Sequence, residues 1–212
     1  MAHDATSSAS SATPSAPARS LAWRPVDIIT AAVLGVACGL IFAVWNGIGG
    51  AGFSAFDALT PGLGGLVTGV WVMGGVLGGL IIRKPGAALL VEVVAASVSA
   101  ILGSQWGLPT LYSGLVQGLG AELIFAIVVY RRFTVTIAIT AGIAASIAEW
   151  GLELFTSGNL AMSFTFNIIY MGCMAVSGAI LGGLLAWYLM KGLAATGALD
   201  RFAAGREQRT EV

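Results

Sequence analysis

Six long apolar stretches, separated by short polar connections, constrain the fold of this chain more than any other feature of its sequence. A helix crosses the hydrocarbon core of a bilayer with about 20 mostly apolar residues. Within lipid, a helix also satisfies its own backbone hydrogen bonds. Only 9% of the residues are charged, against about a quarter in soluble domains. We therefore expect an all-α, polytopic membrane protein with six transmembrane helices.

The pattern also predicts where the spans and the tails lie. The expected spans are 26–46, 61–82, 86–103, 110–130, 134–156 and 164–190. Residues 1–22 are rich in Ala, Ser, Thr and Pro, so we expect a disordered cytoplasmic tail before a transmembrane domain over 23–191. Residues 192–212 are expected to form a cytoplasmic tail or an interfacial helix, with Leu193, Leu199 and Phe202 against the bilayer.

The basic residues predict the orientation. With six crossings, every Lys and Arg falls on one side of the membrane, and the connections 47–60, 104–109 and 157–163 carry none. Short loops rich in Lys and Arg stay in the cytoplasm. We therefore expect a multi-pass protein of the cell membrane with both termini cytoplasmic.

Several kinds of chemistry lack their usual residues. The histidine at position 3 lies in the expected tail, so a Ser-His hydrolase site is not expected in the membrane. Cys38 and Cys173 stand alone in apolar runs, without metal-ligand spacing. No GxxxxGK[ST] motif is present. We expect no enzyme activity, no metal and no cofactor, with ATP bound only by partner subunits, and no basic surface for nucleic acid.

Glutamates at membrane depth are the strongest functional signal. Glu149 and Glu153 are four residues apart and share a helical face near the outer end of the fifth span. Counted from the cytoplasmic end at about 1.5 Å per residue, they lie about 22 and 28 Å up, but Glu92 only about 9 Å. No Lys, Arg or His lies in any expected span. Intramembrane carboxyl groups are costly and mark functional sites.

Aromatic and amide side chains gather at the same outer level. Together with the outer glutamates they predict a pocket for a flat, positively charged organic molecule, through stacking, cation–π attraction and ion pairing. The candidate substrate-binding residues are Glu149, Glu153, Trp150, Trp106, Gln105, Tyr112, Gln117, Glu122, Asn167, Tyr170, Trp45 and Asn46.

Structural roles remain open beside these functional ones. Any single Trp or Tyr of the set also suits an anchor at the membrane interface. Glu92 and Glu122 suit either a hydrogen bond to a neighbouring helix or a role in substrate binding or coupling. The small residues Ala31, Gly35 and Gly39 repeat every four positions on the first helix, which suits packing within the bundle or docking of a partner subunit.

Several stretches resemble the YkoE family. They are WRPVDIITAAVLGVACGLIFAVWN from residue 23, IIRKPGAALLVEVVAA from 81, SQWG at 104–107, SGLVQGLGAELIF at 113–125 and YRR at 130–132. The resemblance covers about residues 23–190. Gln105, Trp106, Gln117 and Glu122 match the family pattern directly, whereas Glu149, Glu153, Asn167 and Tyr170 are chosen on depth and chemistry.

The resemblance implies a bundle like that of the S components of energy-coupling factor (ECF) transporters. The resemblance also implies that the chain captures thiamine, a cationic vitamin, or its hydroxymethylpyrimidine precursor on the outer side. It works with a transmembrane coupling protein and two cytoplasmic ATPases. Ala31, Gly35 and Gly39 would meet the coupling protein, and the glycine-rich loop 47–60 would close over the site. The alternatives are a stand-alone proton-coupled secondary transporter, using Glu92 and Glu122, and a membrane enzyme.

Overall fold

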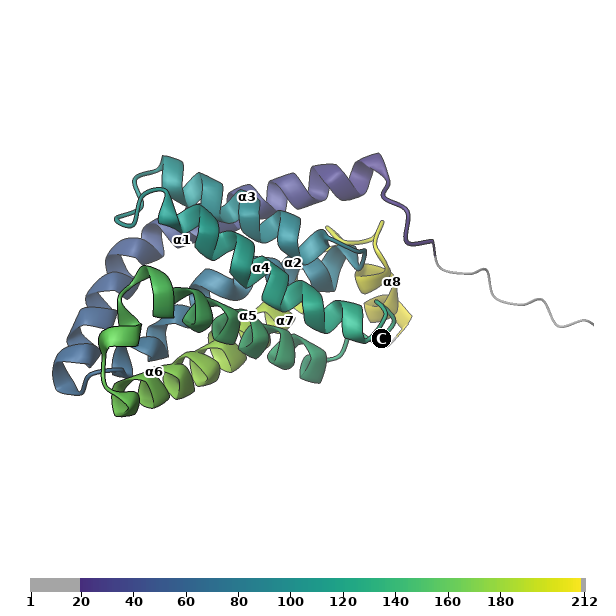
Figure 1. The fold of residues 1–212 in the computed structure, drawn as a ribbon. Coiled ribbons are helices and arrows are strands. Elements are labelled where there is room, and N and C mark those ends of the chain that lie inside the picture. The colour runs from purple at the N-terminus through teal and green to yellow at the C-terminus, as the bar shows by residue number, and fades with distance from the viewer. Residues whose placement is uncertain (1–19, 211–212) are drawn as a thin grey trace, which may run out of the picture.

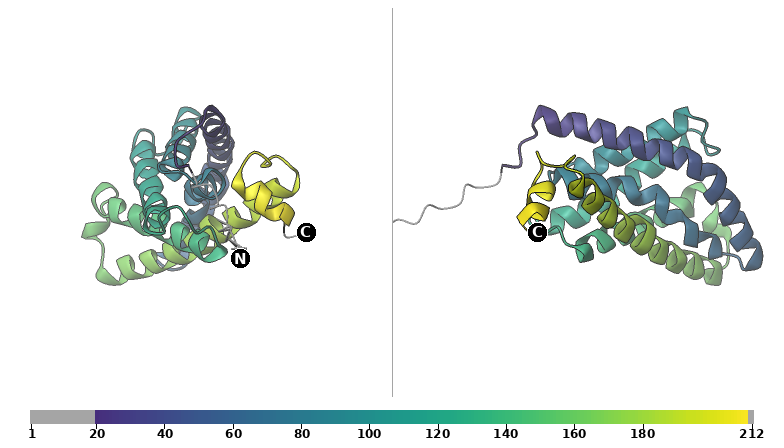
Figure 2. Two further views of the ribbon diagram at one scale, coloured as in Figure 1. Left: turned by 90° about the vertical axis from the view of Figure 1, so that its right-hand side faces the viewer. Right: turned by 180° about the vertical axis from the view of Figure 1, so that it is seen from behind.

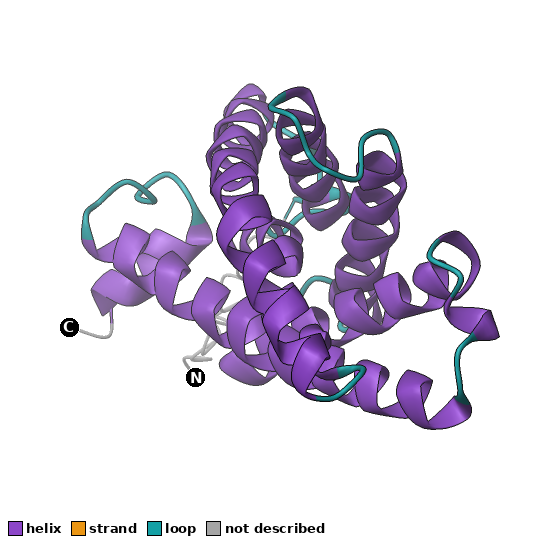
Figure 3. Cartoon of the chain, turned by 90° about the vertical axis from the view of Figure 1, so that its left-hand side faces the viewer, coloured by secondary structure: helices purple, strands orange, loops and turns teal. Residues whose placement is uncertain are grey.

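The computed structural model describes residues 20–210, which form a bundle of helices without β-strands (Figures 1 and 3). Most of the expected tail, residues 1–22, lies outside the described part. In chain order the helices are α1 (Pro25–Leu59), the 3-10 helix η1 (Leu63–Val72), α2 (Met73–Ile82), α3 (Ala87–Ile101), α4 (Pro109–Ile127), α5 (Val135–Thr156), the 3-10 turn η2 (Asn159–Ala161), α6 (Phe164–Ser177), the π-helix η3 (Gly178–Leu184), α7 (Leu185–Ala195) and α8 (Ala203–Thr210).

The expected spans agree with these helices to within a few residues, except where the first span continues. Within residues 20–210, five helical segments are long and apolar enough to cross a membrane, and α3 is a shorter apolar helix of 15 residues. The second span consists of η1 followed by α2, and the sixth of α6, η3 and α7 in one continuous run. The all-α, six-helix architecture is therefore as the sequence predicts.

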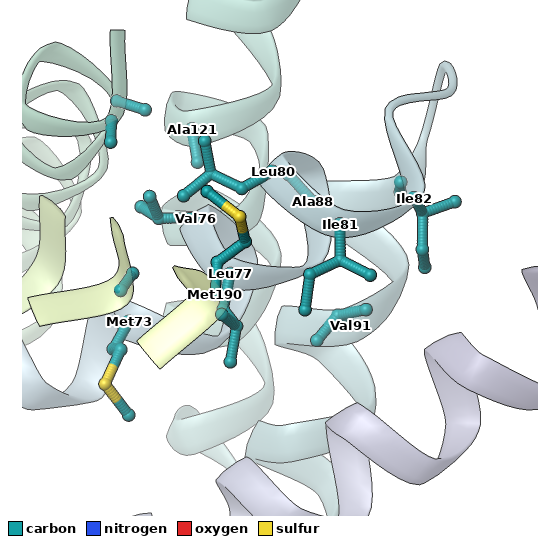
Figure 4. Packing of buried hydrophobic residues seen from close by; sticks show 14 of the residues in the cluster. Met73, Val76, Leu77, Leu80, Ile81, Ile82, Ala88, Val91, Ala121 and Met190 are labelled. Atoms are coloured by element: carbon teal, nitrogen blue, oxygen red, sulfur yellow. The ribbon is translucent and has the colours of Figure 1, made fainter. Parts of the chain in front are cut away.

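Helix α2 forms the centre of the bundle. Every residue from Met73 to Ile82 is buried, and Figure 4 shows Leu77, Leu80 and Ile81 among side chains from α3, α4 and α7. Its glycines permit this position, because a Cβ on Gly79 would lie 2.2 Å from the Phe125 ring. A helix surrounded on all sides can be apolar throughout, which explains why it shows no polar face.

The fifth and sixth spans approach each other at glycines. A Cβ on Gly142 of α5 would lie 2.1 Å from the carbonyl oxygen of Gly178, the first residue of η3. A Cβ on Gly183 would lie 2.5 Å from the carbonyl oxygen of Ala138. Small residues allow two helix backbones to pack at this distance, so these glycines fix the close contact between α5 and η3.

The described chain begins and ends at one end of the bundle, where a buried ion pair ties several segments together (Figure 1). Asp27 is fully buried and pairs with Arg24 at 2.8 Å and with Lys84 at 2.6 Å. Buried Arg83 of the α2–α3 turn pairs with Glu207 of α8 at 2.6 Å. These contacts tie the start of α1, the α2–α3 turn and α8 to one another at the end where the sequence places its basic residues.

The connection 47–60 is helical, contrary to the expected loop. Helix α1 runs without a break to Leu59 and curves across the end of the bundle opposite the described termini (Figures 1 and 2). Glycine has low helix propensity, so packing stabilises this extension rather than intrinsic preference. Phe53 packs edge-on against Tyr170, with ring centroids 6.0 Å apart.

The small residues on the first helix show one of the two roles that the sequence leaves open for them, packing within the bundle. Ala31, Gly35 and Gly39 are buried within the chain rather than presented to a partner. Cβ atoms on Gly35 and Gly39 would lie 2.5 Å from Val94 and Val98 of α3. The four-residue repeat therefore serves close packing of α1 on α3, and these residues are covered as long as that packing holds.

The C-terminal segment packs against the protein. Leu199 and Phe202, which the sequence suggested would face the bilayer, are each 4% exposed and belong to the hydrophobic core. Arg24 lies over the Phe202 ring, 5.8 Å from its centroid. Residues 192–210 therefore continue α7, turn, and return α8 to the bundle.

Candidate functional site

A cavity of about 620 Å³ opens at the end of the bundle crossed by the α1 extension. Helix α1 supplies Asn46, Gly50, Phe53 and Asp57, which share one helical face because they are spaced by three or four residues. The other walls come from η1, α3, α4, α5, α6 and the loops between them. The α1 extension thus forms a helical wall where a flexible loop was expected.

Three glutamates line the cavity. Glu149 and Glu153 come from α5, as the sequence predicts, and Glu92 comes from α3. Glu92 is 1% exposed and Glu149 6%, so both carboxyl groups are largely removed from bulk solvent. Of the described residues, none that lines the cavity is Lys, Arg or His. The cavity is therefore acidic, without a basic side chain to neutralise it.

Gln117 of α4 lies between two of these carboxyl groups. With its amide oriented to satisfy its surroundings, the Gln117 nitrogen donates to Glu92 Oε1 at 3.2 Å and to the carbonyl oxygen of Trp71 at 3.1 Å. Gln117 and Ser113 also interact with the Glu149 carboxyl group. The backbone N–H of Gly75 donates to Glu92 Oε2. Polar contacts with the same amide therefore help to hold both Glu92 and Glu149 in place.

A second polar network joins α1 to η1 and α3. The Trp71 indole N–H donates to Asn46 Oδ1 at 3.0 Å, and Asn46 Nδ2 donates to the hydroxyl of Ser99 at 3.0 Å. The Trp71 ring meets the Trp106 ring at 87°, with centroids 5.2 Å apart. The two perpendicular rings line the same cavity as the glutamates.

Helix α6 contributes further aromatic side chains to the cavity lining. Tyr170 is 3% exposed, interacts with Glu153, and stacks on Phe166 with ring centroids 5.6 Å apart. Carboxylates beside aromatic faces attract an organic cation through charge and through the ring quadrupole. The site has the chemistry that the sequence predicts.

Seven of the predicted site residues line the cavity: Asn46, Gln105, Trp106, Gln117, Glu149, Glu153 and Tyr170. Three of the remaining five were placed on the right segments but the wrong faces. Tyr112 is 61% exposed on the outside of the bundle, Trp150 lies outside the cavity lining, and Trp45 donates its indole N–H to the Val67 carbonyl at 3.0 Å.

Asn167 also has a structural position. Its side-chain nitrogen donates to the carbonyl oxygen of Asn159 at 2.8 Å, which ties α6 to the preceding 3-10 turn. It does not line the cavity. Asn159, whose carbonyl oxygen accepts this hydrogen bond, does line the cavity.

Glu122 is the clearest correction among the predicted site residues. Its carboxyl group accepts hydrogen bonds from the backbone N–H of Gly86 at 2.7 Å and of Ala88 at 2.9 Å, at the start of α3. The Tyr130 hydroxyl donates to it at 2.7 Å. Burial and this hydrogen bond raise the pKa of Tyr130, so the phenol remains a donor. Glu122 of α4 therefore caps the start of α3, which lies 36 residues earlier in the chain.

Glu92 lies nearer to the outer end of its helix than it would in a span of full length, because α3 has only 15 residues. Measured inward from the outer helix ends at Ile101 and Thr156, Glu92 lies about 14 Å deep and Glu149 about 11 Å. The sequence estimate counted from the cytoplasmic side and assumed that each helix starts at the same level. The brevity of this span was the signal that could have placed Glu92 with the outer glutamates.

Trp71 and Ser113 were missed altogether as site residues. Trp71 stands inside an apolar span, well away from either expected interface, where an anchoring role does not explain it. Ser113 precedes Gln117 by four residues and so shares its helical face. Both signals were present in the sequence.

The fold and the cavity together define a class: a multi-pass membrane protein with an acidic, aromatic-lined cavity between its transmembrane helices. Residues 26–148 match the family model described as the permease component of an ABC-type cobalt transport system. A curated relative from Bacillus subtilis (strain 168), named YkoE and described as an HMP/thiamine permease protein, is 33% identical over 187 residues. These are 87% of this chain and 92% of that protein.

A solved structure extends the comparison to three dimensions. The crystal structure of an S-component of ECF transporter matches with a TM-score of 0.77 and 28% identity, covering 90% of this chain and 95% of that chain. The chain belongs to the YkoE family of S components. It is a transport subunit, not an enzyme.

Proposed function

We propose that this S component captures thiamine or its hydroxymethylpyrimidine precursor in the acidic cavity. The observation that carries the proposal is the meeting of Glu92, Glu149 and Glu153 with the rings of Trp71 and Trp106 in a cavity without basic residues among those described. Thiamine is a permanent cation with two flat rings. The relative named for HMP and thiamine supports this choice of ligand.

The size of the cavity supports the same ligand class. Ligand pockets for small organic molecules measure about 300–1,000 Å³, and this one measures about 620 Å³. A bare metal ion makes no use of stacked aromatic walls, whereas a flat cation does. The lining therefore favours an organic vitamin over the cobalt in the name of the family model.

The partners and the orientation follow from the same proposal. The chain would deliver its ligand together with a transmembrane coupling protein and two ATPases, which would bind the ATP that the transport step needs. The Lys and Arg residues cluster in the loops at the end opposite the cavity mouth, which supports a cytoplasmic location for both termini and an outward-facing mouth.

A stand-alone proton-driven carrier, using Glu92 and Glu122, receives less support. Glu122 caps α3 and is not part of the cavity lining, so the two glutamates do not form one relay. The comparisons also favour an S component over this alternative.

Reconstitution in liposomes tests the proposal. The purified chain alone should bind labelled thiamine but should not accumulate it under a pH gradient. Accumulation should require co-reconstituted coupling protein and ATPases with ATP. Accumulation by the chain alone, driven by the pH gradient, would contradict the proposal and favour the carrier.

A further inference from the structure

The cavity contains more carboxyl groups than one monovalent ligand can balance. Glu149 lies close enough to Glu92 and to Glu153 for their negative charges to repel. Asp57 of α1 adds a carboxyl group to the same lining and accepts a hydrogen bond from the Gly62 N–H at 2.7 Å. Four acidic side chains thus surround a space of about 620 Å³.

The elements packed around these glutamates supply no compensating positive charge among the described residues that line the cavity. Helix α1 contributes Asp57 and the Cys38 thiol beside Glu92, and α6 contributes the Tyr170 phenol. The η1 and α4 residues that line the cavity carry no ionisable side chain. Every titratable group facing the cluster is therefore neutral or negative.

Like charges in a poorly solvated site do not all ionise. Two neighbouring carboxyl groups commonly retain a shared proton, and their titration belongs to the group rather than to one residue. Gln117 interacts with both Glu92 and Glu149, so the contacts that hold the two carboxyl groups are linked through one amide. Without a cation, the cluster is expected to retain at least one proton.

Glu153 provides an independent observation that points to a ligand. Its Oε2 atom is buried and makes no hydrogen bond within the described structure. Glu153 lines the cavity together with Tyr170 and Phe166. A buried carboxylate oxygen without a partner beside aromatic rings is a suitable position for a ligand cation.

We infer that capture of a cationic ligand displaces a proton from the cluster formed by Glu92, Glu149 and Glu153. The inference rests on the proposed function and extends it. One carboxyl O–H bond breaks, the proton passes to solvent through the mouth, and the ligand's positive charge replaces it, so the net charge of the cavity is unchanged. A neutral pyrimidine brings no charge and displaces no proton. The preference between the two vitamins therefore depends on pH.

Calorimetry in two buffers measures this exchange. Thiamine is titrated into the purified protein at pH 7.5 in phosphate and in Tris, whose ionisation enthalpies differ. The difference between the two binding enthalpies should correspond to release of a substantial fraction of one proton. Hydroxymethylpyrimidine, neutral at this pH, should release none. Thiamine affinity should rise with pH by up to about tenfold per unit while the cluster is protonated.

Two variants test whether the proton released on thiamine binding comes from the glutamate cluster. Glu92→Gln removes one carboxyl group without changing shape and should reduce the number of protons released on thiamine binding. Glu122→Gln also removes a membrane-depth carboxyl group, but outside the cavity, and should leave the number unchanged. Melting temperatures of both variants show whether each is folded.

Three outcomes distinguish failure of proton displacement from failure of the proposed function. Equal enthalpies in both buffers, with thiamine affinity independent of pH from 5.5 to 8.5, would overturn proton displacement and leave the proposed function standing. Equal proton release by thiamine and by the neutral pyrimidine would also overturn it. Failure of both vitamins to bind would remove the proposed function and this inference together.

Discussion

Replacing Glu149 with Gln should weaken thiamine binding strongly. The change keeps the shape of the side chain and removes its charge, and Glu149 is only 6% exposed, so solvent screens it little. A cation about 5 Å away in an effective dielectric of about 20 gains about 3 kcal/mol from one carboxylate. This corresponds to a loss of about a hundredfold in affinity, at the lower end of the cost of breaking a buried charge pair.

Tryptophan fluorescence measures this loss directly. Trp71 and Trp106 line the cavity and contact each other, so a bound ligand should quench their emission. Titration of wild-type protein and Glu149→Gln with thiamine gives the two dissociation constants. Hydroxymethylpyrimidine, which lacks the thiazolium ring, should bind both proteins with similar affinity. Thiamine constants within threefold of each other would refute the electrostatic role of Glu149.

Three further changes test contacts that hold the fold together. Glu122→Gln should cost about 1–3 kcal/mol of stability by weakening the cap on α3, measured as a lower melting temperature in detergent, with unchanged thiamine affinity. Gly142→Ala should cost about 1–3 kcal/mol, because the new Cβ would lie 2.1 Å from the Gly178 carbonyl oxygen. Lys84→Met should cost about 3 kcal/mol or more by depriving buried Asp27 of a partner, and Asp27→Asn in the same chain should recover part of that loss. A melting temperature equal to that of wild type in any of the three would contradict the corresponding contact.

The sequence was sufficient to predict the helices because the bilayer imposes their length and composition. The expected span 134–156 differs by one residue from α5, Val135–Thr156. The C-terminal end of α1 could not be predicted in the same way. Glycines in the stretch 47–60 indicate a loop by intrinsic propensity, and tertiary packing of Phe53 against Tyr170 contributes to overriding that preference.

The sequence predicts that the site is acidic and aromatic, but it identifies only some of the residues that line the cavity. Helical periodicity places Glu149 and Glu153 on one face, and that face lines the cavity. Periodicity does not say which face turns inward, so Trp150 and Tyr112 were chosen for their depth alone. Glu122 interacts with the start of α3, 36 residues earlier in the chain, through a contact that no local pattern encodes.

A structure determined with thiamine bound tests the central claim most directly. The account predicts the ligand inside the cavity, with its thiazolium ring within about 5 Å of a carboxylate oxygen of Glu149 or Glu153 and a ring face against Trp106, Trp71 or Tyr170. Thiamine bound at another place on the protein, or in the cavity with the thiazolium turned away from all three glutamates, would contradict it.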